Sequence, residues 1–242
     1  MIFLLSIIPS LLIIIKLRNR RKDDALYVKS CNSAIKSGFF SILPVIGVSA
    51  VFALAVRLLK LTLLKNANYF INEAIYTFIV LALAEELVKF QCLRVLLKKR
   101  YNEYTWADVV AFMVIIGTGF GLIEDIPYAI GASPAVMLVR GITMGHVGYG
   151  FIMGWFYGKY LDTGKRRFGI IAFMLPFLLH GLYDFSLNAK LLELNDNLAA
   201  IALSLALIDI ILLILMIRFF IRAKRIERYN YPLQNSLAEV PE

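Results

Sequence analysis

Cysteine and histidine are scarce in this chain of 242 residues, and internal repeats and low-complexity segments are absent. There are two cysteines, Cys31 in a basic segment and Cys92 in an apolar one, so no disulfide framework is expected. The chain contains neither His-Glu-x-x-His nor Gly-x-Ser-x-Gly, which argues against a zincin-type zinc helix and against a nucleophile elbow. No basic region precedes the apolar amino terminus, so we expect an uncleaved membrane anchor rather than a signal peptide.

Apolar residues, in contrast, make up 60% of the chain, and the mean hydropathy is +0.74. A soluble domain of this size cannot bury so much apolar surface, whereas lipid tails can solvate it. Strand alternation is missing, so we expect an all-α, polytopic transmembrane helix bundle. The apolar runs fall at about 2–16, 38–59, 72–97, 106–130, 134–158, 168–188 and 198–218. They predict seven spans, of which only the first is shorter than the roughly 20 residues that a spanning helix needs.

Basic residues are distributed unevenly between alternate loops. The loops 16–36, 94–105, 159–167 and 218–228 hold 7, 4, 4 and 5 lysines and arginines, whereas the opposite loops with their adjoining helix ends hold 5. Because basic loops stay cytoplasmic, the amino terminus is predicted outside and the carboxyl terminus inside. If the first run did not span, the amino terminus would be cytoplasmic and the other spans would keep their orientation. The net charge of +9 therefore indicates topology, and no nucleic-acid partner is expected.

Ionisable residues interrupt five of the apolar runs. They are Glu85, Glu86 and Lys89 in the third run, Glu124 in the fourth, His146 in the fifth, His180 and Asp184 in the sixth, and Asp209 in the seventh. A charge at the bilayer centre costs roughly 2.5–3.5 kcal/mol on insertion scales, so such residues face the bundle interior or water and indicate function. Asp209 belongs to no motif, and we expect a structural or solvating role for it.

Helical spacing predicts which of these residues meet. Lys89 lies four residues after Glu85 and three after Glu86, so either glutamate can pair with it. His180 and Asp184 are four residues apart and share one helix face. The positions of the cluster along the runs place it between the midplane and the outer leaflet.

The whole chain, residues 1–242, is expected to form one integral membrane domain. The buried charges fall in a core at about 72–188, and residues 223–242 form a polar cytoplasmic tail. Small-xxx-small spacings occur at Gly141/Gly145 and Gly150/Gly154/Gly158. These spacings are typical of helices that pack closely in a membrane.

Carboxylates and histidines inside a membrane fit two classes of function. An intramembrane protease would use them to activate water and to stabilise an oxyanion. An ion- or proton-coupled transporter would use them as a relay, but we find no inverted repeat with paired broken helices. A non-catalytic scaffold of the same fold is the third alternative.

The motifs resemble those of the PrsW family of intramembrane proteases, related to the CAAX-processing and bacteriocin-protection (CPBP) proteases. The resemblance rests on "EELVK", which contains Glu85, Glu86 and Lys89, on "FGLIE", which contains Phe120 and Glu124, on His146, and on "HGLYD", which contains His180 and Asp184. These elements cover residues 85–184 in family order. Asp125 stands where the family pattern has asparagine, a mild departure.

The resemblance implies a catalytic role for each motif. Glu85 is the general base that activates water, and Glu86 pairs with Lys89. The remaining motif residues orient the water and bind the oxyanion: Glu124, His146, His180 and Asp184. Spacing alone leaves open which of Glu85 and Glu86 is the base, because they point in directions about 100° apart.

The same resemblance implies a substrate and raises the question of a metal. It implies cleavage of a single-pass protein, such as an anti-sigma factor, on the outer side of a bacterial cell membrane. Two carboxylates and two histidines can ligate Zn²⁺, and the candidate ligands are Glu85, Glu124, His146 and His180. We expect a glutamate mechanism without a metal, with Zn²⁺ as the alternative. The oligomeric state stays open.

Overall fold

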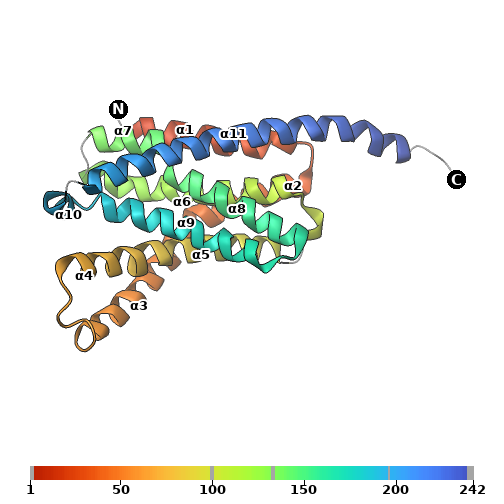
Figure 1. The fold of residues 1–242 in the computed structure, drawn as a ribbon. Coiled ribbons are helices and arrows are strands. Elements are labelled where there is room, and N and C mark those ends of the chain that lie inside the picture. Colours follow the sequence, from red (N-terminus) through yellow and green to blue (C-terminus); the bar gives the residue numbers. More distant parts are fainter. Residues whose placement is uncertain (1–2, 99–100, 132–133, 196, 239–242) are drawn as a thin grey trace.

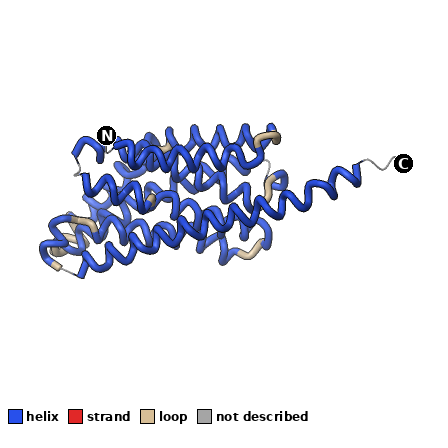
Figure 2. Tube along the Cα trace, turned by 90° about the horizontal axis from the view of Figure 1, so that it is seen from above, coloured by secondary structure: helices blue, strands red, loops and turns tan. Residues whose placement is uncertain are grey.

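The computed structural model describes residues 3–98, 101–131, 134–195 and 197–238. Within these ranges the chain is helical, with turns and loops between the helices and no strand, as the composition predicts. Figure 2 shows the helices lying side by side along one axis, with the end of the last helix extending beyond the others. The all-α expectation is therefore confirmed.

The first half of the described chain holds α1 (Phe3–Arg18), α2 (Ala25–Phe40), α3 (Ile42–Lys60), α4 (Tyr69–Ile75), a π-helix (Tyr76–Ala82) and α5 (Leu83–Leu97). The second half holds α6 (Trp106–Gly131), α7 (Pro134–Thr143), α8 (Gly145–Thr163), α9 (Arg166–Ser186), α10 (Ala189–Leu194) and α11 (Asn197–Ala238). Short 3-10 turns lie at Asn19–Arg21 and Tyr101–Glu103. The α1–α2 and α8–α9 turns lie at the end of the bundle where α11 extends, opposite α10 (Figure 1).

Four helices of the described chain are long and apolar enough to cross a membrane. They are Ile42–Lys60, Trp106–Pro127, Arg166–Ser186 and Asn197–Arg225. The other predicted spans are the short α1, the interrupted α4–π–α5 segment and the interrupted α7–α8 segment. The chain is thus polytopic, whereas seven spans and their orientation stay predictions.

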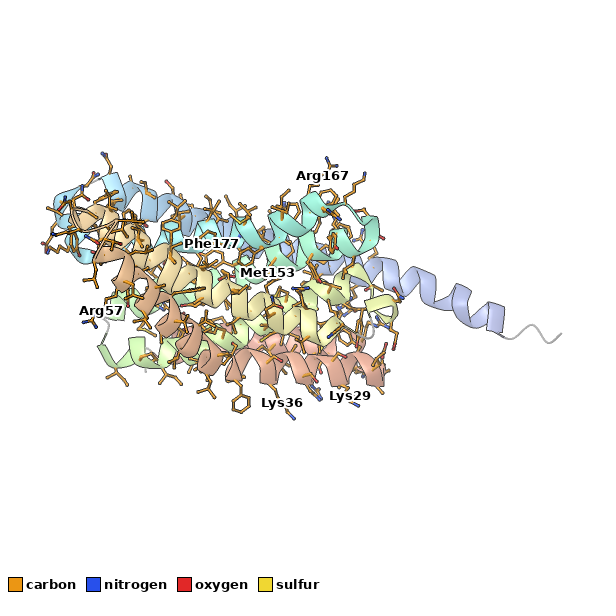
Figure 3. The ribbon with its side chains drawn as sticks, turned by 90° about the horizontal axis from the view of Figure 1, so that it is seen from below. Lys29, Lys36, Arg57, Met153, Arg167 and Phe177 are labelled. Carbon is orange, nitrogen blue, oxygen red and sulfur yellow. The ribbon has the colours of Figure 1, made fainter. Side chains whose placement is uncertain are left out.

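Helix α6 lies at the centre of the bundle and is buried along most of its length. It packs closely against α8, because the residues of α8 at this contact include glycines, which have no side chain. A Cβ atom on Gly154 would lie 2.8 Å from the Cα of Val110, and one on Gly150 would lie 2.9 Å from the backbone oxygen of Met113. These approaches explain the small-xxx-small spacing of α8. Met153 of α8 is buried in the interior of the bundle, whereas Lys29 and Lys36 of α2 point away from the bundle (Figure 3).

The segment 16–36 is largely helical, although the charge pattern predicts a loop there. Asp24 caps α2 by accepting a hydrogen bond from the backbone N–H of Tyr27. Tyr27, Cys31 and Ala34 are buried at helical spacing on the face that meets α6. The apolar side of α2 is narrow, so its two lysines and its other polar residues hide the helix in a hydropathy profile.

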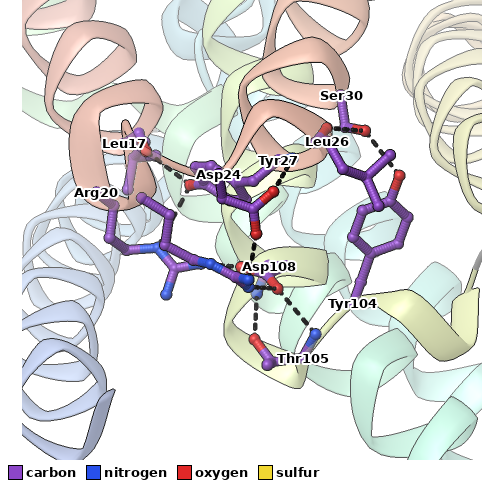
Figure 4. A network of polar contacts seen from close by, with 10 residues as sticks. Leu17, Arg20, Asp24, Leu26, Tyr27, Ser30, Tyr104, Thr105 and Asp108 are labelled. Atoms are coloured by element: carbon purple, nitrogen blue, oxygen red, sulfur yellow. Dashed lines mark hydrogen bonds and ion pairs between the residues drawn. The ribbon is translucent and has the colours of Figure 1, made fainter. Parts of the chain in front are cut away.

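A polar network joins the α1–α2 turn to the first turn of α6 (Figure 4). The buried carboxylate of Asp108 forms ion pairs with Arg20 and, at 2.6 Å, with Arg21. It also accepts a hydrogen bond from the backbone N–H of Thr105 at 2.8 Å. The network is paired within itself, so its role is to hold α1 and α2 against α6.

Candidate functional site

Helix α5 contributes Glu85, Glu86 and Lys89 to the interior of the bundle. Lys89 and Glu86 are almost fully buried, and the Lys89 ammonium lies 2.6 Å from Glu86 Oε1. Its distance to Glu85 Oε2 is longer, at 3.7 Å. Of the two pairings that the spacing allows, the lysine therefore makes the closer one with Glu86.

Helix α9 places His180 between carboxylates on both sides of its ring. Its Nδ1 lies 2.8 Å from Glu86 Oε1, and its Nε2 lies 3.1 Å from Asp184 Oδ2. The Asp184 contact is the pair expected from the four-residue spacing. Glu85 Oε2 lies 3.7 Å from the same Nε2 atom. His180 thus links α9 to the carboxylates of α5.

Glu124 of α6 and His146 of α8 form the second pair of the site. His146 Nε2 lies 2.5 Å from Glu124 Oε2, and His146 Nδ1 lies 3.1 Å from the Lys89 ammonium. Because an ammonium only donates, Nδ1 accepts and Nε2 carries the proton directed at Glu124. Phe120 contacts both His146 and Lys89. Its ring is perpendicular to the His146 ring, with centroids 5.1 Å apart, and the Lys89 ammonium lies 4.5 Å from its centroid.

The predicted fifth span is interrupted directly before His146. Met144 adopts a left-handed conformation with φ 47° and ψ 47°, which ends α7 and starts α8. Among the described residues it is the one non-glycine residue with positive φ. A methionine in this conformation is strained, and such strain persists where surrounding contacts enforce it. The break turns the His146 side chain toward Glu124.

Arg140 is a site residue that the sequence did not single out. From α7 it donates to Glu124 Oε2 at 3.0 Å and to Asp125 Oδ1 at 2.8 Å. Glu124 is therefore held by Arg140 and His146 together, and the acidic Asp125 has a cationic partner. The sequence gives little indication of this role, because a single arginine near the start of an apolar run is also typical of a charged residue in a loop.

A pocket brings these elements together. It is lined by Thr118, Gly121, Glu124 and Asp125 of α6, Arg140 and Thr143 of α7, Met144, Gly145, His146, Val147 and Tyr149 at and after the break, His180, Tyr183 and Asp184 of α9, and Ser10 of α1. Tyr149 stacks on the His180 ring at 5.3 Å. Glu85 does not line the pocket, but its Oε2 atom lies 3.7 Å from Nε2 of the lining residue His180. This oxygen is buried with no hydrogen-bond partner among the described residues. A water molecule is the simplest partner for that atom.

The donors also suit a divalent metal by type and by distance. Ligand atoms of Glu85, His146 and His180 all lie within 4.8 Å of one another, and carboxylate and imidazole are ligands of Zn²⁺. The unpartnered Oε2 of Glu85 is one atom that a metal would satisfy. Glu124, the fourth expected ligand, instead pairs with the His146 ring. Binding of a metal would replace the present hydrogen bonds of both histidines.

Asp209 of α11 is buried beside the site rather than in it. Its Oδ2 atom has no hydrogen-bond partner within the described part of the chain. A Cβ atom on Gly145 would lie 3.3 Å from that oxygen. Asp209 therefore contacts the first residue of α8, next to His146.

Comparison with known proteins agrees with this geometry. Residues 36–217 match a family described as PrsW family intramembrane metalloprotease. The Protease PrsW of Clostridioides difficile (strain 630) is 28% identical over 198 residues, which cover 77% of this chain and 79% of that protein. The Protease PrsW of Shouchella clausii (strain KSM-K16) is 27% identical over 158 residues, which cover 64% and 73%. No solved structure matches the chain.

The matched region contains every motif residue of the site, from Glu85 on α5 to Asp184 on α9. Membership of a protease family decides against the transporter alternative and against a non-catalytic scaffold. The chain is a peptidase and a multi-pass membrane protein, and it belongs to the PrsW family of intramembrane proteases.

Proposed function

We propose that this protein is a glutamate-type intramembrane endopeptidase in which Glu85 activates the attacking water. One observation carries the assignment of the base. Glu85 Oε2 is buried and has no hydrogen-bond partner among the described residues, whereas Glu86 Oε1 is engaged by Lys89 at 2.6 Å and by His180 at 2.8 Å. A general base needs a free lone pair within reach of a water, and of these two glutamates Glu85 is the one with such an oxygen.

The proposed reaction starts with a water held at Glu85 Oε2. Glu85 accepts a proton from this water, and the hydroxide oxygen bonds to the carbonyl carbon of the scissile peptide. The carbonyl oxygen becomes an oxyanion, and we assign its stabilisation to His180, whose Nε2 atom lies 3.7 Å from Glu85 Oε2. The proton then passes from Glu85 to the peptide nitrogen, and the carbon–nitrogen bond breaks.

The other charged residues orient these groups. Asp184 and Glu86 hold the two nitrogens of His180, and Glu124 holds His146. Lys89 neutralises Glu86 and fixes the His146 ring through its Nδ1 atom. Positioning of this kind is what makes a histidine an effective donor.

The proposed substrate is a single-pass membrane protein, for example an anti-sigma factor, cleaved in the outer half of the membrane. Glu124 and Asp184 lie toward the ends of α6 and α9 that are remote from the α8–α9 turn. In the orientation predicted by the basic loops, those ends face outward. The position of the pocket supports cleavage near the outer surface.

Co-expression with tagged single-pass membrane proteins tests the function. The wild-type protein should cleave its substrate, and Glu85→Gln should abolish cleavage while the protein still folds, because the amide keeps the shape but is not a base. Glu193→Gln on α10 is the matched control, because that glutamate is exposed and away from the site. Full cleavage by Glu85→Gln would overturn the assignment of the base.

The metal question has its own test. If bound, Zn²⁺ would be held by Glu85, His146 and His180 and would polarise a bound water. We expect chelators to leave the activity of the purified protein nearly unchanged. Loss of activity on chelation, restored by stoichiometric Zn²⁺, would replace the metal-free mechanism while keeping the protease.

A further inference from the structure

The π-helix directly before the catalytic segment packs against α9 at the residue after His180. Phe78, in the π-helix Tyr76–Ala82, presents the edge of its ring to Gly181. A Cβ atom on Gly181 would lie 2.5 Å from Phe78 Cδ1 and 2.6 Å from Cε1. Cβ atoms in proteins essentially never lie that close to a neighbouring atom. Position 181 must therefore be glycine as long as the Phe78 ring keeps its place.

The ring of Phe78 is held in place by two further rings of α9. Phe177 meets it edge-on, with centroids 5.9 Å apart and an interplanar angle of 83°. Phe185 lies on the other side, at 6.4 Å and 50°. Because these contacts come from one turn before and one turn after Gly181, the ring is wedged against α9 at the level of His180.

The π-helix explains how Phe78 and Glu86 reach the same neighbour. Eight residues separate them, and in an uninterrupted α-helix they would face directions about 80° apart. A π-helix closes its hydrogen bonds over five residues and so turns less per residue, which reduces that offset. Both side chains then face α9, where Glu86 Oε1 lies 2.8 Å from His180 Nδ1.

We infer that Phe78 is a positioning residue for the proposed reaction, and that its contact with Gly181 sets the separation of α5 and α9 at which Glu86 holds His180. The inference rests on the proposed function for its kinetic consequence only. Widening this contact would move His180 away from Glu86 and Glu85 together. A misplacement of about 1 Å in a catalytic group can cost on the order of 10²-fold in rate.

The test compares Gly181→Ala, Phe78→Ala and the double variant, using the single-pass substrate found by co-expression. Gly181→Ala should lower kcat on the order of 10²-fold with little change in KM, because the chemistry and not the binding of substrate is disturbed. Removing the ring makes room for the new methyl group, so the double variant should recover at least about tenfold of the lost rate. Gly47→Ala on α3 is the matched control, because a Cβ atom there meets nothing within 4 Å.

A second measurement needs no substrate and so separates this inference from the proposed function. His180 is 2% exposed with both ring nitrogens engaged, so diethyl pyrocarbonate should modify it slowly. Peptide mass spectrometry should show faster modification in Gly181→Ala and restored protection in the double variant. If the wild-type protein cleaves nothing, the proposed function fails while this measurement still stands.

Three outcomes would overturn the inference. The first is a Gly181→Ala protein with unchanged kcat and a protected His180. The second is a raised KM with normal kcat, which would make the contact part of a substrate-binding wall. The third is a double variant that is as inactive or as poorly folded as Gly181→Ala alone.

Discussion

At the scale of single residues, the site gives neighbouring glutamates different surroundings. Glu86 shares one oxygen between a lysine and a histidine, whereas Glu85 keeps an oxygen with no hydrogen-bond partner among the described residues. The difference follows from their directions on α5, since residues next to each other on a helix point about 100° apart. One carboxylate is therefore fixed by its ion pair, and the other keeps an oxygen that is free to accept a hydrogen bond.

The buried Lys89 ammonium leads us to predict that substitution of this lysine affects folding rather than the chemical reaction. Lys89→Ala would strand the buried carboxylate of Glu86, and removal of one partner of a buried pair typically costs about 3–5 kcal/mol. The yield of folded protein should fall sharply. Lys89→Ala combined with Glu86→Ala should recover much of that yield, although the double variant loses a hydrogen bond to His180. Size-exclusion profiles and thermal unfolding in detergent measure both effects.

A different result would change the role of the lysine. If Lys89→Ala folded with normal thermal stability but cleaved nothing, the ammonium would act directly in the reaction. Its 3.1 Å contact with His146 Nδ1 is the route by which it would do so.

At the scale of helices, the site depends on two interruptions of regular α-helical geometry. The π-helix before α5 brings Phe78 and Glu86 toward α9. The left-handed Met144 between α7 and α8 lets Arg140 and His146 reach Glu124 from two directions. Continuous helices would separate these groups.

The close contact between α6 and α8 leads us to predict that an alanine in place of a contact glycine of α8 lowers the stability of the protein. Gly154→Ala would place a methyl group 2.8 Å from the Cα of Val110, a backbone atom that cannot move aside. The two helices must separate, and overpacking of this kind typically costs about 1–3 kcal/mol. We expect a lower thermal unfolding temperature and reduced cleavage, because α6 carries Glu124 and α8 carries His146.

Gly47→Ala is the matched control for this experiment, since position 47 is open. It should unfold at nearly the wild-type temperature. Equal unfolding temperatures for Gly154→Ala and Gly47→Ala would show that the close contact between α6 and α8 does not contribute to stability.

At the scale of the whole molecule, the buried charges must lie in a bundle that faces lipid elsewhere. Helix α3 shows the contrast, because most of its surface is apolar and exposed. The residues of the candidate site gather instead where α5, α6, α8 and α9 meet, with Arg140 of α7 beside them. This arrangement keeps hydrocarbon and charge apart, as a membrane requires.

The topology prediction belongs to this scale. Reporter fusions after residues 23, 65, 102, 132, 163, 195 and 230 should alternate, starting on the cytoplasmic side, because alternate loops carry most of the lysines and arginines. Alkaline phosphatase and green fluorescent protein report the outer and the cytoplasmic side respectively. Two adjacent fusions on the same side would remove the predicted span that lies between them.

The sequence by itself determined the helical class, the membrane environment and the family. Long apolar runs leave helices as the only economical way to satisfy backbone hydrogen bonds in lipid. The sequence also predicted the Glu86–Lys89 and His180–Asp184 contacts, because each joins residues three or four apart on one helix. The segment 16–36 was predicted wrongly as a loop, since a helix with a narrow apolar side leaves little trace in hydropathy.

Only the tertiary structure decided how the helices face one another. Three contacts join residues that are far apart in the sequence. They are the hydrogen bond between His180 and Glu86, the hydrogen bond from Arg140 to Glu124, and the packing of Phe78 against Gly181. Each depends on the rotation and spacing of two helices, and these are set by the π-helix, by the break at Met144 and by glycine contacts. Spacing along one helix carries no information about the rotation of its neighbour, so these pairings required the packed bundle.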